Sequence, residues 1–453
     1  MQETLHYIEQ NKERFRDELY SLLRIPSISA KPEHRNDMYA CANRWCELLV
    51  AAGADRAQLM ETGYNPVVYG EKIINPEWPT VIVYGHYDVM PAEPLELWNS
   101  DPFEPEVRDG RLWGRGTDDD KGQAFIQVKA FEIALKRNML HCNVKFLFEG
   151  GEEVGSPGLE EFCANNRELL TGDVILVSDT SMVGREHPSL TTGLRGLAYW
   201  EIEVTGPCRD LHSGHFGGAV ANPINVLCKM LAGITDADGR ITIPHFYDDA
   251  EELSPEERAM MAAVPYDEKA YCDAIGVKAL SGEKGYSTIE RAASRPTFDI
   301  CGIWGGYTGE GSKTVLPSKA HAKVSCRLIP NQDYHKITQQ FIDYIAAIAP
   351  ATVDVKVTPM HGSESYVCPI GIPAYKAAEK GFALAFGQQP LAVRRGGSIG
   401  VIPIFERVLG LKSVLMGFGL EKNAIHSPNE SFALEMYERG IVAVVEFYNQ
   451  YKG

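Results

Sequence analysis

Short apolar runs alternate with amphipathic segments over the first part of this chain of 453 residues. The apolar runs stop abruptly at polar residues and predict strands at 79–86, 142–150 and 173–179. The amphipathic segments predict helices at 1–20, 122–137 and 156–170, and the first helix has Leu5, Ile8, Phe15 and Leu19 available for a buried face. Near the C-terminal end the pattern returns, with a helix expected over 372–387, a strand over 412–419 and a helix over 431–451. Apolar strands separated by helices are typical of a parallel sheet covered on both faces.

The middle of the chain follows a different period. Residues 196–206 and 319–330 alternate apolar and polar positions, which predicts strands with one face in water. Between them, residues 248–276 form an acidic segment with a helical pattern. We therefore expect an α/β domain formed by residues 1–196 and 362–453, interrupted by a second α+β domain over 197–361.

Charge and cysteine content narrow the class of protein. The formal charge, 44 basic minus 61 acidic residues, is −17, which disfavours nucleic acid or an anionic membrane as a partner. No apolar run approaches the ~18 residues of a membrane-spanning helix, and the N-terminal stretch lacks the apolar region of a signal peptide. The ten cysteines form no CxxC pair, so they read as reduced, mostly buried thiols of a cytoplasmic protein rather than as a zinc ribbon.

The first predicted strand ends in GHYDV, where His86 and Asp88 lie two residues apart. Side chains at this spacing project to the same side of a strand. His86 could bind a metal through one ring nitrogen, while Asp88 accepts a hydrogen bond from the other and orients the ring. The alternative is a half-buried histidine beside a turn aspartate.

Two further acidic stretches lie at predicted strand or helix ends. In GRGTDDDKGQ, residues 114–123, capping of the next helix explains one aspartate more easily than three, and a carboxylate can bridge two cations. In FEGGEEVGSPGL, residues 148–159, one glutamate could bind a metal and its neighbour could act as a general base. The alternative for the second stretch is an acidic, glycine-rich loop.

Asp179 ends the strand over 173–179, and His426 precedes a turn in AIHSPNE, residues 424–430. Each has a structural alternative, as a turn former and as a loop histidine. Ligands of open parallel sheets bind beyond the carboxyl ends of the strands, where these residues are expected. Two imidazoles with several carboxylates suit zinc and would also accept manganese or cobalt.

These motifs, in this order, resemble those of the M20 family of metallopeptidases. DLHSGHFGG, KTVLPSKAHAKVSCRLIPNQ and RRGGSIGV further resemble the branch that holds the cytosolic non-specific dipeptidases and carnosinases. The resemblance covers nearly the whole chain. It implies an α/β fold, with a zinc-peptidase-like mixed sheet flanked by helices and an inserted α+β lid domain through which many members form homodimers.

The resemblance also implies roles for the motif residues. Two divalent cations, zinc with manganese or cobalt as alternatives, would be held by His86, Asp119, Glu153, Asp179 and His426, with Asp119 as the bridge. Asp88 would orient His86, and Glu152 would be the general base that activates a water molecule. The peptide bond after the bridging aspartate is commonly cis in this family, so a cis bond is expected between Asp119 and Asp120.

In the lid, the resemblance implies that His212 reaches from one subunit into the partner's site and stabilises the developing oxyanion. Thr314 would contact the substrate, and Arg327 with Ser398 would hold its C-terminal carboxylate. We therefore expect a hydrolase that cleaves the peptide bond of dipeptides. An N-acyl amino acid deacylase, a desuccinylase or a carboxypeptidase of the same superfamily remains open, as do a metal-dependent peptide binder without turnover and a structural dimer with a relic site.

Overall fold

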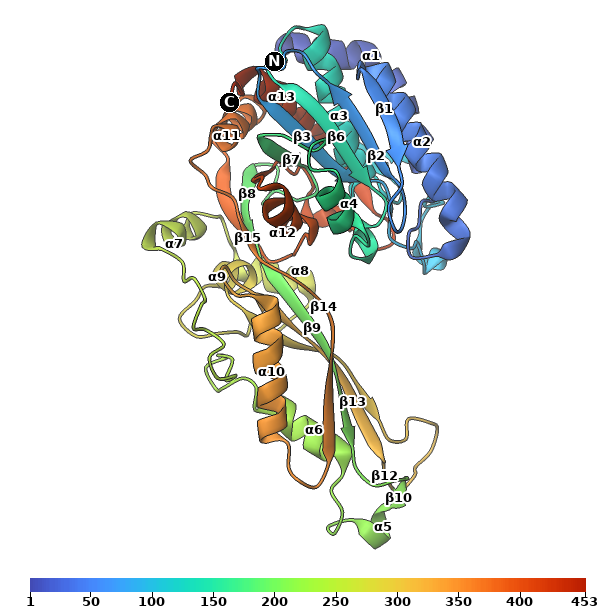
Figure 1. Cartoon of the computed structure of the whole chain (residues 1–453), viewed down its shortest axis with the longest axis vertical. Coiled ribbons are helices and arrows are strands. Elements are labelled where there is room, and N and C mark those ends of the chain that lie inside the picture. Colours follow the sequence, from blue (N-terminus) through green and yellow to red (C-terminus); the bar gives the residue numbers. More distant parts are fainter. The chain divides into compact units, whose positions relative to one another are not determined.

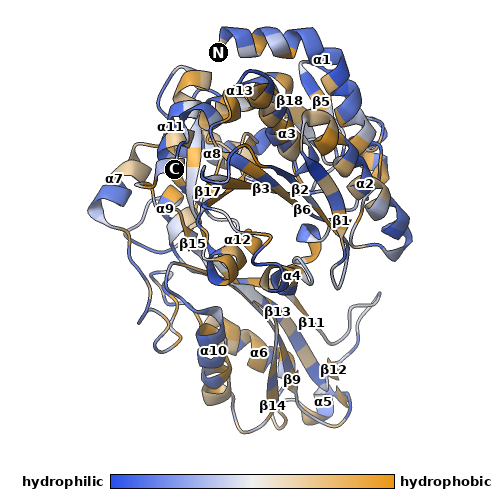
Figure 2. Ribbon diagram, turned by 45° about the horizontal axis from the view of Figure 1, so that its top comes forward, coloured by the Kyte–Doolittle hydropathy of each residue, from blue (hydrophilic) through white to orange (hydrophobic).

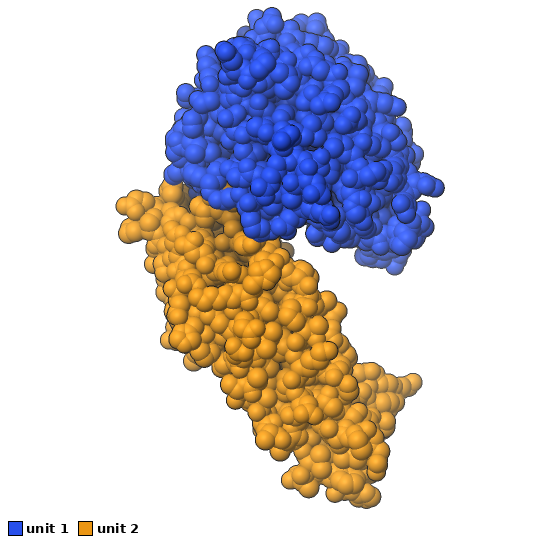
Figure 3. Space-filling model, in the orientation of Figure 1, with its two compact units in different colours: residues 1–192, 368–393, 400–453 blue, residues 193–367, 394–399 orange.

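The computed structural model describes residues 1–453, which form two compact units (Figures 1 and 3). Unit 1 consists of residues 1–192, 368–393 and 400–453. Unit 2 consists of residues 193–367 and 394–399. The short segment 394–399 therefore groups with unit 2, although the chain before and after it belongs to unit 1.

A mixed sheet of nine strands forms the centre of unit 1, and its last strand, β15, belongs to unit 2. Its order is β1-β2-β6-β3-β7-β17-β8-β15, and β16 pairs with β8. The strands are β1 (Arg56–Met60), β2 (Val67–Lys72), β3 (Thr80–His86), β6 (Asn143–Glu149), β7 (Val174–Val177), β8 (Ser189–Leu194), β15 (Tyr366–Val367), β16 (Leu391–Arg395) and β17 (Ser413–Leu415). β8 runs across the boundary between the two units, pairing with β17 near its middle and with β15 at its end.

The four central strands β6, β3, β7 and β17 are parallel to one another. β2 pairs antiparallel with β6, and β8 pairs antiparallel with β17. β6 is buried along its whole length, and β3 is buried beyond its first residue. The continuous apolar runs at 79–86, 142–150 and 173–179 therefore correspond to strands with helices on both faces, as predicted.

Helices and short helical turns cover this sheet. They are α1 (Gln2–Leu23), η1 (Pro32–His34), α2 (Arg35–Ala52), η2 (Leu95–Leu97), α3 (Lys121–Lys136), η3 (Glu152–Val154), α4 (Leu159–Asn165), α11 (Pro373–Phe386), α12 (Val401–Ile404), η4 (Phe405–Leu409), η5 (Glu421–Asn423) and α13 (Leu434–Gln450). One layer contains α1, α2, α3, α11 and α13, while α4 and α12 lie on the other side of the sheet (Figures 1 and 2). α3 contacts β3, α1, α2 and α13, which is why nearly all of its residues are buried.

Three details of unit 1 differ from the expectations. The helix expected over 156–170 is only α4, which ends at the Asn165–Asn166 pair, because asparagine is a poor helix former. The helix expected over 431–451 begins at Leu434, because residues 431–433 instead form a strand, β18, that pairs with β5 and buries Phe432. Leu5 of α1 is 38% exposed, whereas Ile8, Phe15 and Leu19 are buried as expected.

A small antiparallel sheet lies in the same unit. Its order is β18 (Ser431–Ala433), β5 (Arg111–Trp113), β4 (Glu106–Arg108). This sheet joins the segment before α3 to the segment before α13. It therefore brings the late part of the chain beside the loop that contains the three aspartates.

Unit 2 is built on an antiparallel sheet of four strands in the order β11-β13-β9-β14. The strands are β9 (Gly196–Thr205), β11 (Thr297–Gly305), β13 (Lys319–Leu328) and β14 (Asp354–Ser363). β9 alternates buried and half-buried positions along its length, which confirms the period-two pattern of residues 196–206. One face of the sheet packs against α6 (Pro223–Ala232) and α10 (Tyr334–Ile348), where Trp200 stacks on Phe341 with ring centroids 4.2 Å apart.

The remaining elements of unit 2 are short. They are β10 (Leu211–His212), α5 (Ser213–Phe216), α7 (Pro255–Ala262), α8 (Glu268–Ile275), α9 (Thr288–Ser294) and β12 (Val315–Leu316). α7 and α8 confirm the helical pattern in the acidic segment 248–276. β10 and β12 pair with each other as a two-stranded sheet.

Cysteine burial corrects one expectation. All ten cysteines are free thiols, but only five are buried, and Cys208, Cys228 and Cys301 are exposed. No helix in the structure combines the length and the apolar character that crossing a membrane requires.

Candidate active site

The carboxyl ends of parallel strands bring most of the candidate residues together. His86 is the last residue of β3, Glu152 and Glu153 lie in η3 just after β6, and Asp179 lies two residues beyond β7. Since β6, β3 and β7 are parallel neighbours, their ends meet at one edge of the sheet. The position agrees with the rule that open α/β sheets bind ligands beyond their strand ends.

Asp119 lies at the centre of this group, between two histidines. Its Oδ1 atom is 3.0 Å from Nε2 of His86, and its Oδ2 atom is 2.9 Å from Nε2 of His426. The two oxygens of one carboxylate thus face two different imidazoles. A carboxylate in this arrangement can bridge two cations.

One further carboxylate accompanies each histidine. Oδ2 of Asp179 is 3.9 Å from Nε2 of His86, and Oε2 of Glu153 is 3.1 Å from Nε2 of His426. Two groups that could each hold a metal ion result: His86, Asp119 and Asp179, and Asp119, Glu153 and His426. Within each group the candidate ligand atoms lie within 4.8 Å of one another, and Asp119 belongs to both.

Asp88 contacts both His86 and the turn that carries Glu152 and Glu153. Its Oδ1 atom is 3.3 Å from Nδ1 of His86, and its carboxylate also accepts the backbone N–H groups of Glu152 and Glu153 at 3.3 and 3.2 Å. The hydroxyl of Ser29 donates to Asp88 at 2.7 Å. Asp88 is therefore placed to orient His86, as expected, and it also holds the η3 turn.

Several carboxyl groups are crowded together and buried at this site, so their negative charges need cations beside them. Burial raises the pKa of Glu152 well above its usual value, and burial together with the Asp119 charge raises the pKa of Asp179 to about 7. Hydrogen bonds to Asp119 and Glu153 raise the pKa of His426 to about 10. Buried carboxylates need paired charges or metal ions. Imidazole nitrogens with carboxylate oxygens are also a donor set that zinc accepts, so the residues fit two divalent cations.

The neighbours of Asp119 have other partners. Asp118 accepts a hydrogen bond from the side chain of Asn423 at 2.8 Å, and Asp120 accepts one from the backbone N–H of His86 at 3.2 Å. Burial raises the pKa of both flanking carboxyls well above the usual value. The Asp119–Asp120 peptide bond is cis, as expected. Of the three aspartates, only Asp119 belongs to the two candidate metal groups.

Two of the expected substrate contacts lie together in unit 2. Arg327, on β13, donates from Nη1 to the hydroxyl of Ser398 at 2.8 Å. That hydroxyl in turn donates to the backbone carbonyl of Arg195, whose guanidinium is bound to the carbonyls of Gly396 and Arg295 at 3.1 and 3.0 Å. The guanidinium of Arg327 is thus held in place by Ser398, and a guanidinium can in general bind both oxygens of a carboxylate.

His212 and Thr314 are also neighbours within unit 2. Nε2 of His212 lies 3.4 Å from the hydroxyl of Thr314, and its Nδ1 accepts the backbone N–H of Gly214 at 3.0 Å. Both side chains are exposed. His212 therefore has a defined orientation on a surface of unit 2.

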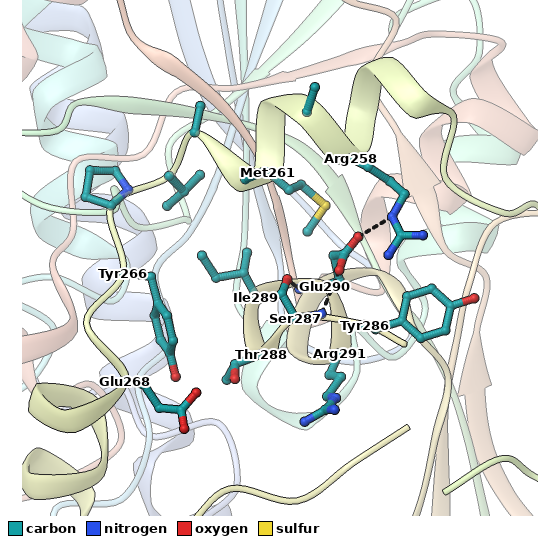
Figure 4. A pocket seen from close by; sticks show the side chains of 15 residues that line it. Arg258, Met261, Tyr266, Glu268, Tyr286, Ser287, Thr288, Ile289, Glu290 and Arg291 are labelled. Atoms are coloured by element: carbon teal, nitrogen blue, oxygen red, sulfur yellow. Dashed lines mark hydrogen bonds and ion pairs between the residues drawn. The ribbon is translucent and has the colours of Figure 1, made fainter. Parts of the chain in front are cut away.

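A separate pocket of about 910 Å³ lies between α7 and α9 in unit 2 (Figure 4). Its walls include Met261, Tyr266 and Ile289, and an ion pair joins Nε of Arg258 to Glu290 at 2.6 Å. None of the residues singled out from the sequence lines it. The chemistry described above lies elsewhere.

Two residues at the site had no role assigned from the sequence. Ser29 precedes Asp88 by 59 residues, and no local pattern links the two. Glu430 was visible only as the last residue of AIHSPNE, yet its fully buried carboxylate contacts the loop that carries Asp119. Its place four residues after His426, directly before the last apolar segment, was the one sequence signal that could have found it.

Comparisons with known proteins agree with this geometry. Residues 82–450 match the model of peptidase family M20/M25/M40. The Cys-Gly metallodipeptidase dug1 of Schizosaccharomyces pombe is 31% identical over 456 residues, covering 96% of this chain and 94% of that protein. The crystal structure of human carnosine dipeptidase 1 superimposes with a TM-score of 0.84 at 27% identity, covering 100% of this chain and 98% of that chain.

A third relative is the M20 family metallo-carboxypeptidase Sso-CP2 of Sulfolobus solfataricus. Its structure gives a TM-score of 0.87 at 30% identity and covers 96% of this chain and 98% of that chain. These similarities extend over the catalytic strands and the inserted unit alike. They confirm the resemblance and the fold class expected from the motifs. The chain therefore belongs to peptidase family M20/M25/M40 and is a metallopeptidase of the M20 type.

Proposed function

We propose that this protein is a dipeptidase that hydrolyses the peptide bond of dipeptides at a site holding two divalent cations. The observation that carries the proposal is the carboxylate of Asp119, each oxygen of which faces one histidine. His86 with Asp179 and His426 with Glu153 would hold one cation each, and Asp119 would bridge them. The relatives named as dipeptidases, matched over nearly the whole chain, support the substrate class.

Bound divalent cations supply Lewis-acid polarisation and lower the pKa of water. Zinc is the cation that we propose first, with manganese and cobalt as alternatives, because the donor set is mixed nitrogen and oxygen. Glu152 belongs to neither metal group, and its raised pKa suits a residue that takes a proton from water and returns it to the leaving amine. Asp88 orients His86 and holds the η3 turn that carries Glu152.

Arg327 and Ser398 would bind the C-terminal carboxylate of the dipeptide, and Thr314 would contact the substrate. The support is the fixed pairing of the Arg327 guanidinium with the Ser398 hydroxyl. A free carboxylate requirement would follow, since a guanidinium binds two oxygens of one carboxylate. Dipeptides would then be preferred over their C-terminal amides.

We further propose that the chain forms a homodimer through unit 2, with His212 completing the partner's site as a donor to the developing oxyanion. β11 is an edge strand with exposed Ile300, Ile303 and Trp304, and a strand edge with apolar side chains can pair with a second copy. His212 is exposed and held by Gly214 and Thr314. Ten free cysteines support a cytoplasmic location.

The test uses metal-free protein, with zinc, manganese or cobalt added back separately. Dipeptides, tripeptides, N-acetylated amino acids and N-succinylated amino acids are assayed side by side. Release of amino acids from dipeptides alone supports the proposal. The structural similarity to a metallo-carboxypeptidase favours a second candidate, and faster cleavage of longer peptides would support that candidate instead.

Single-residue variants test the roles. Glu152→Gln should bind metal like the wild type and lose about 10²–10⁴-fold in kcat, since that is the usual contribution of general acid–base catalysis. Glu161→Gln, which changes an exposed glutamate of α4, is the matched control and should keep full activity. Mixing His212→Ala chains with Glu152→Gln chains should restore part of the activity, and no recovery would count against a shared site.

A further inference from the structure

Glu430 has a fully buried carboxylate that accepts four hydrogen bonds. Its Oε2 atom accepts Nη1 of Arg115 at 2.8 Å and the backbone N–H of Gly116 at 3.0 Å. Its Oε1 atom accepts the backbone N–H groups of Asp118 and Asp119 at 2.9 and 3.2 Å. Three backbone donors and one guanidinium from a single loop therefore converge on this one side chain.

Residues 429 and 430 form further hydrogen bonds, both to the same loop and to the segment 97–99. The carbonyl of Glu430 accepts the N–H of Gly114 at 3.1 Å. Next to it, the side chain of Asn429 accepts the N–H of Asn99 and donates to the carbonyl of Leu97, both at 2.8 Å. The segment that follows His426 is therefore fixed at both its side chains and its backbone.

Glu430 joins two segments that are far apart in sequence and that each supply a residue to one metal group. Asp119 lies in the loop that Glu430 binds, and His426 lies four residues before Glu430. These two side chains meet at 2.9 Å, in the group that also contains Glu153. Glu430 thus links the backbone that carries Asp119 to the segment that carries His426.

Neutralising the charge of Arg115 does not by itself explain the four hydrogen bonds that Glu430 accepts. A carboxylate can satisfy a guanidinium with one edge, whereas here three of the four accepted bonds come from the backbone that carries Asp119. A glutamine in the same place would present an amide N–H₂ group to at least one of those donors. Leaving buried donors unpaired is costly, so the loop would shift.

We infer that Glu430 is a positioning residue that sets the relative placement of Asp119 and His426 for cation binding. The inference rests on the proposed function, because it takes these two side chains as ligands of the proposed site. Residues that orient metal ligands typically change metal affinity about 10–100-fold when they are replaced. Glu430 itself belongs to neither candidate metal group.

The test measures the affinity of the full-length, metal-free chain for Zn²⁺ by competition with a coloured chelator, and compares Co²⁺ absorption spectra. Glu430→Gln removes the charge, and Glu430→Asp keeps the charge but shortens the reach. We expect both to bind Zn²⁺ about 10–100-fold more weakly than the wild type. The matched control is Glu132→Gln, which alters another fully buried, ion-paired glutamate in the last turns of α3 and should leave Zn²⁺ affinity unchanged.

A double variant separates positioning from charge balance. Arg115→Met combined with Glu430→Gln restores neutrality but not the two carboxylate oxygens that accept the backbone N–H groups of the loop, so Zn²⁺ affinity should stay low even where thermal stability recovers. Affinity that returns with stability would overturn the inference, as would wild-type affinity in both single variants of Glu430. A wild-type chain that binds no Zn²⁺ would overturn the proposed function together with the inference, which distinguishes the two failures.

Discussion

The buried carboxylate of Glu132 offers a quantitative test of the contacts that hold the N-terminal helix α1 against α3. Its side chain is fully buried in α3 and faces three cations. Arg14 of α1 lies 2.6 Å from it, and Lys129 and Lys136 each lie at 2.9 Å. The hydroxyl of Tyr7 adds a hydrogen bond at 3.0 Å. Replacing Glu132 with glutamine removes the one anion that contacts all three cations, while Glu18 still contacts Arg14 and Lys129.

The pKa of Glu132 gives the magnitude. Burial alone would raise this pKa, but the hydrogen bond from Arg14 and the charge of Lys129 outweigh burial and lower it from 4.5 to about 2. At about 1.4 kcal/mol per pH unit, this difference corresponds to at most about 3 kcal/mol of folding free energy. The value agrees with the cost of about 3–5 kcal/mol for breaking a buried ion pair from one side.

The lowered pKa of Glu132 also determines how its contribution to stability changes with pH. A carboxyl whose pKa is lower in the folded state stabilises the fold above its unfolded pKa, and this stability is lost as pH falls from 4.5 through about 2. Glu132→Gln should therefore be less stable than the wild type by about 3 kcal/mol at neutral pH, and the gap should fall below about half of that near pH 3.

Urea unfolding of the metal-free proteins, followed by circular dichroism at several pH values, measures this gap. Turnover at 25 °C in the absence of urea should be unchanged, since Glu132 contacts none of the candidate site residues. Equal stabilities at neutral pH, or a gap that stays constant down to pH 3, would refute the reasoning.

Three further predictions follow from particular contacts. Arg327→Lys should raise KM for dipeptides with little change in kcat and should reduce the preference over C-terminal amides, because an ammonium lacks the planar pair of N–H groups that matches the two oxygens of a carboxylate. An unchanged preference in a steady-state assay would contradict the role. Trp200→Ala should lower the unfolding free energy of unit 2 by about 3–5 kcal/mol, because the indole is fully buried against Phe341. A loss below about 1 kcal/mol in urea unfolding would count against that packing. Gly150→Ala would bring the new Cβ against the ring of Tyr87, so the turn that carries Glu152 must move. We expect kcat to fall at least about tenfold, and wild-type kinetics would show that the turn adapts without loss.

The sequence was informative where the chain obeys local rules. Continuous apolar runs that end in His86 and Asp179 are strands buried on both faces, and parallel strands bring such ends together without further information. The resemblance then singled out Asp119 among three aspartates, and in the structure only this one faces both histidines.

The remaining features depend on contacts between distant segments. Ser29 reaches Asp88 from a loop near the N-terminus, and Phe432 joins a strand because Leu112 lies opposite it. Residues 394–399 group with unit 2, where the backbone of Gly396 lies so close to Arg195 that its carbonyl accepts the guanidinium. Such pairings leave no periodic trace, so they become visible only when the chain is folded.

The position of β17 in the sheet has a consequence for biosynthesis. This strand lies between β7 and β8, which the ribosome completes long before it reaches residues 413–415. At ~5–20 residues per second, the nascent chain waits for more than about ten seconds with the edge of β7 unpaired. By then His86, Asp119 and Asp179 have been translated, whereas the group with Glu153 lacks its histidine until residue 426 emerges. Translation therefore completes one candidate cation-binding group well before the other, and the inserted unit is made in the interval.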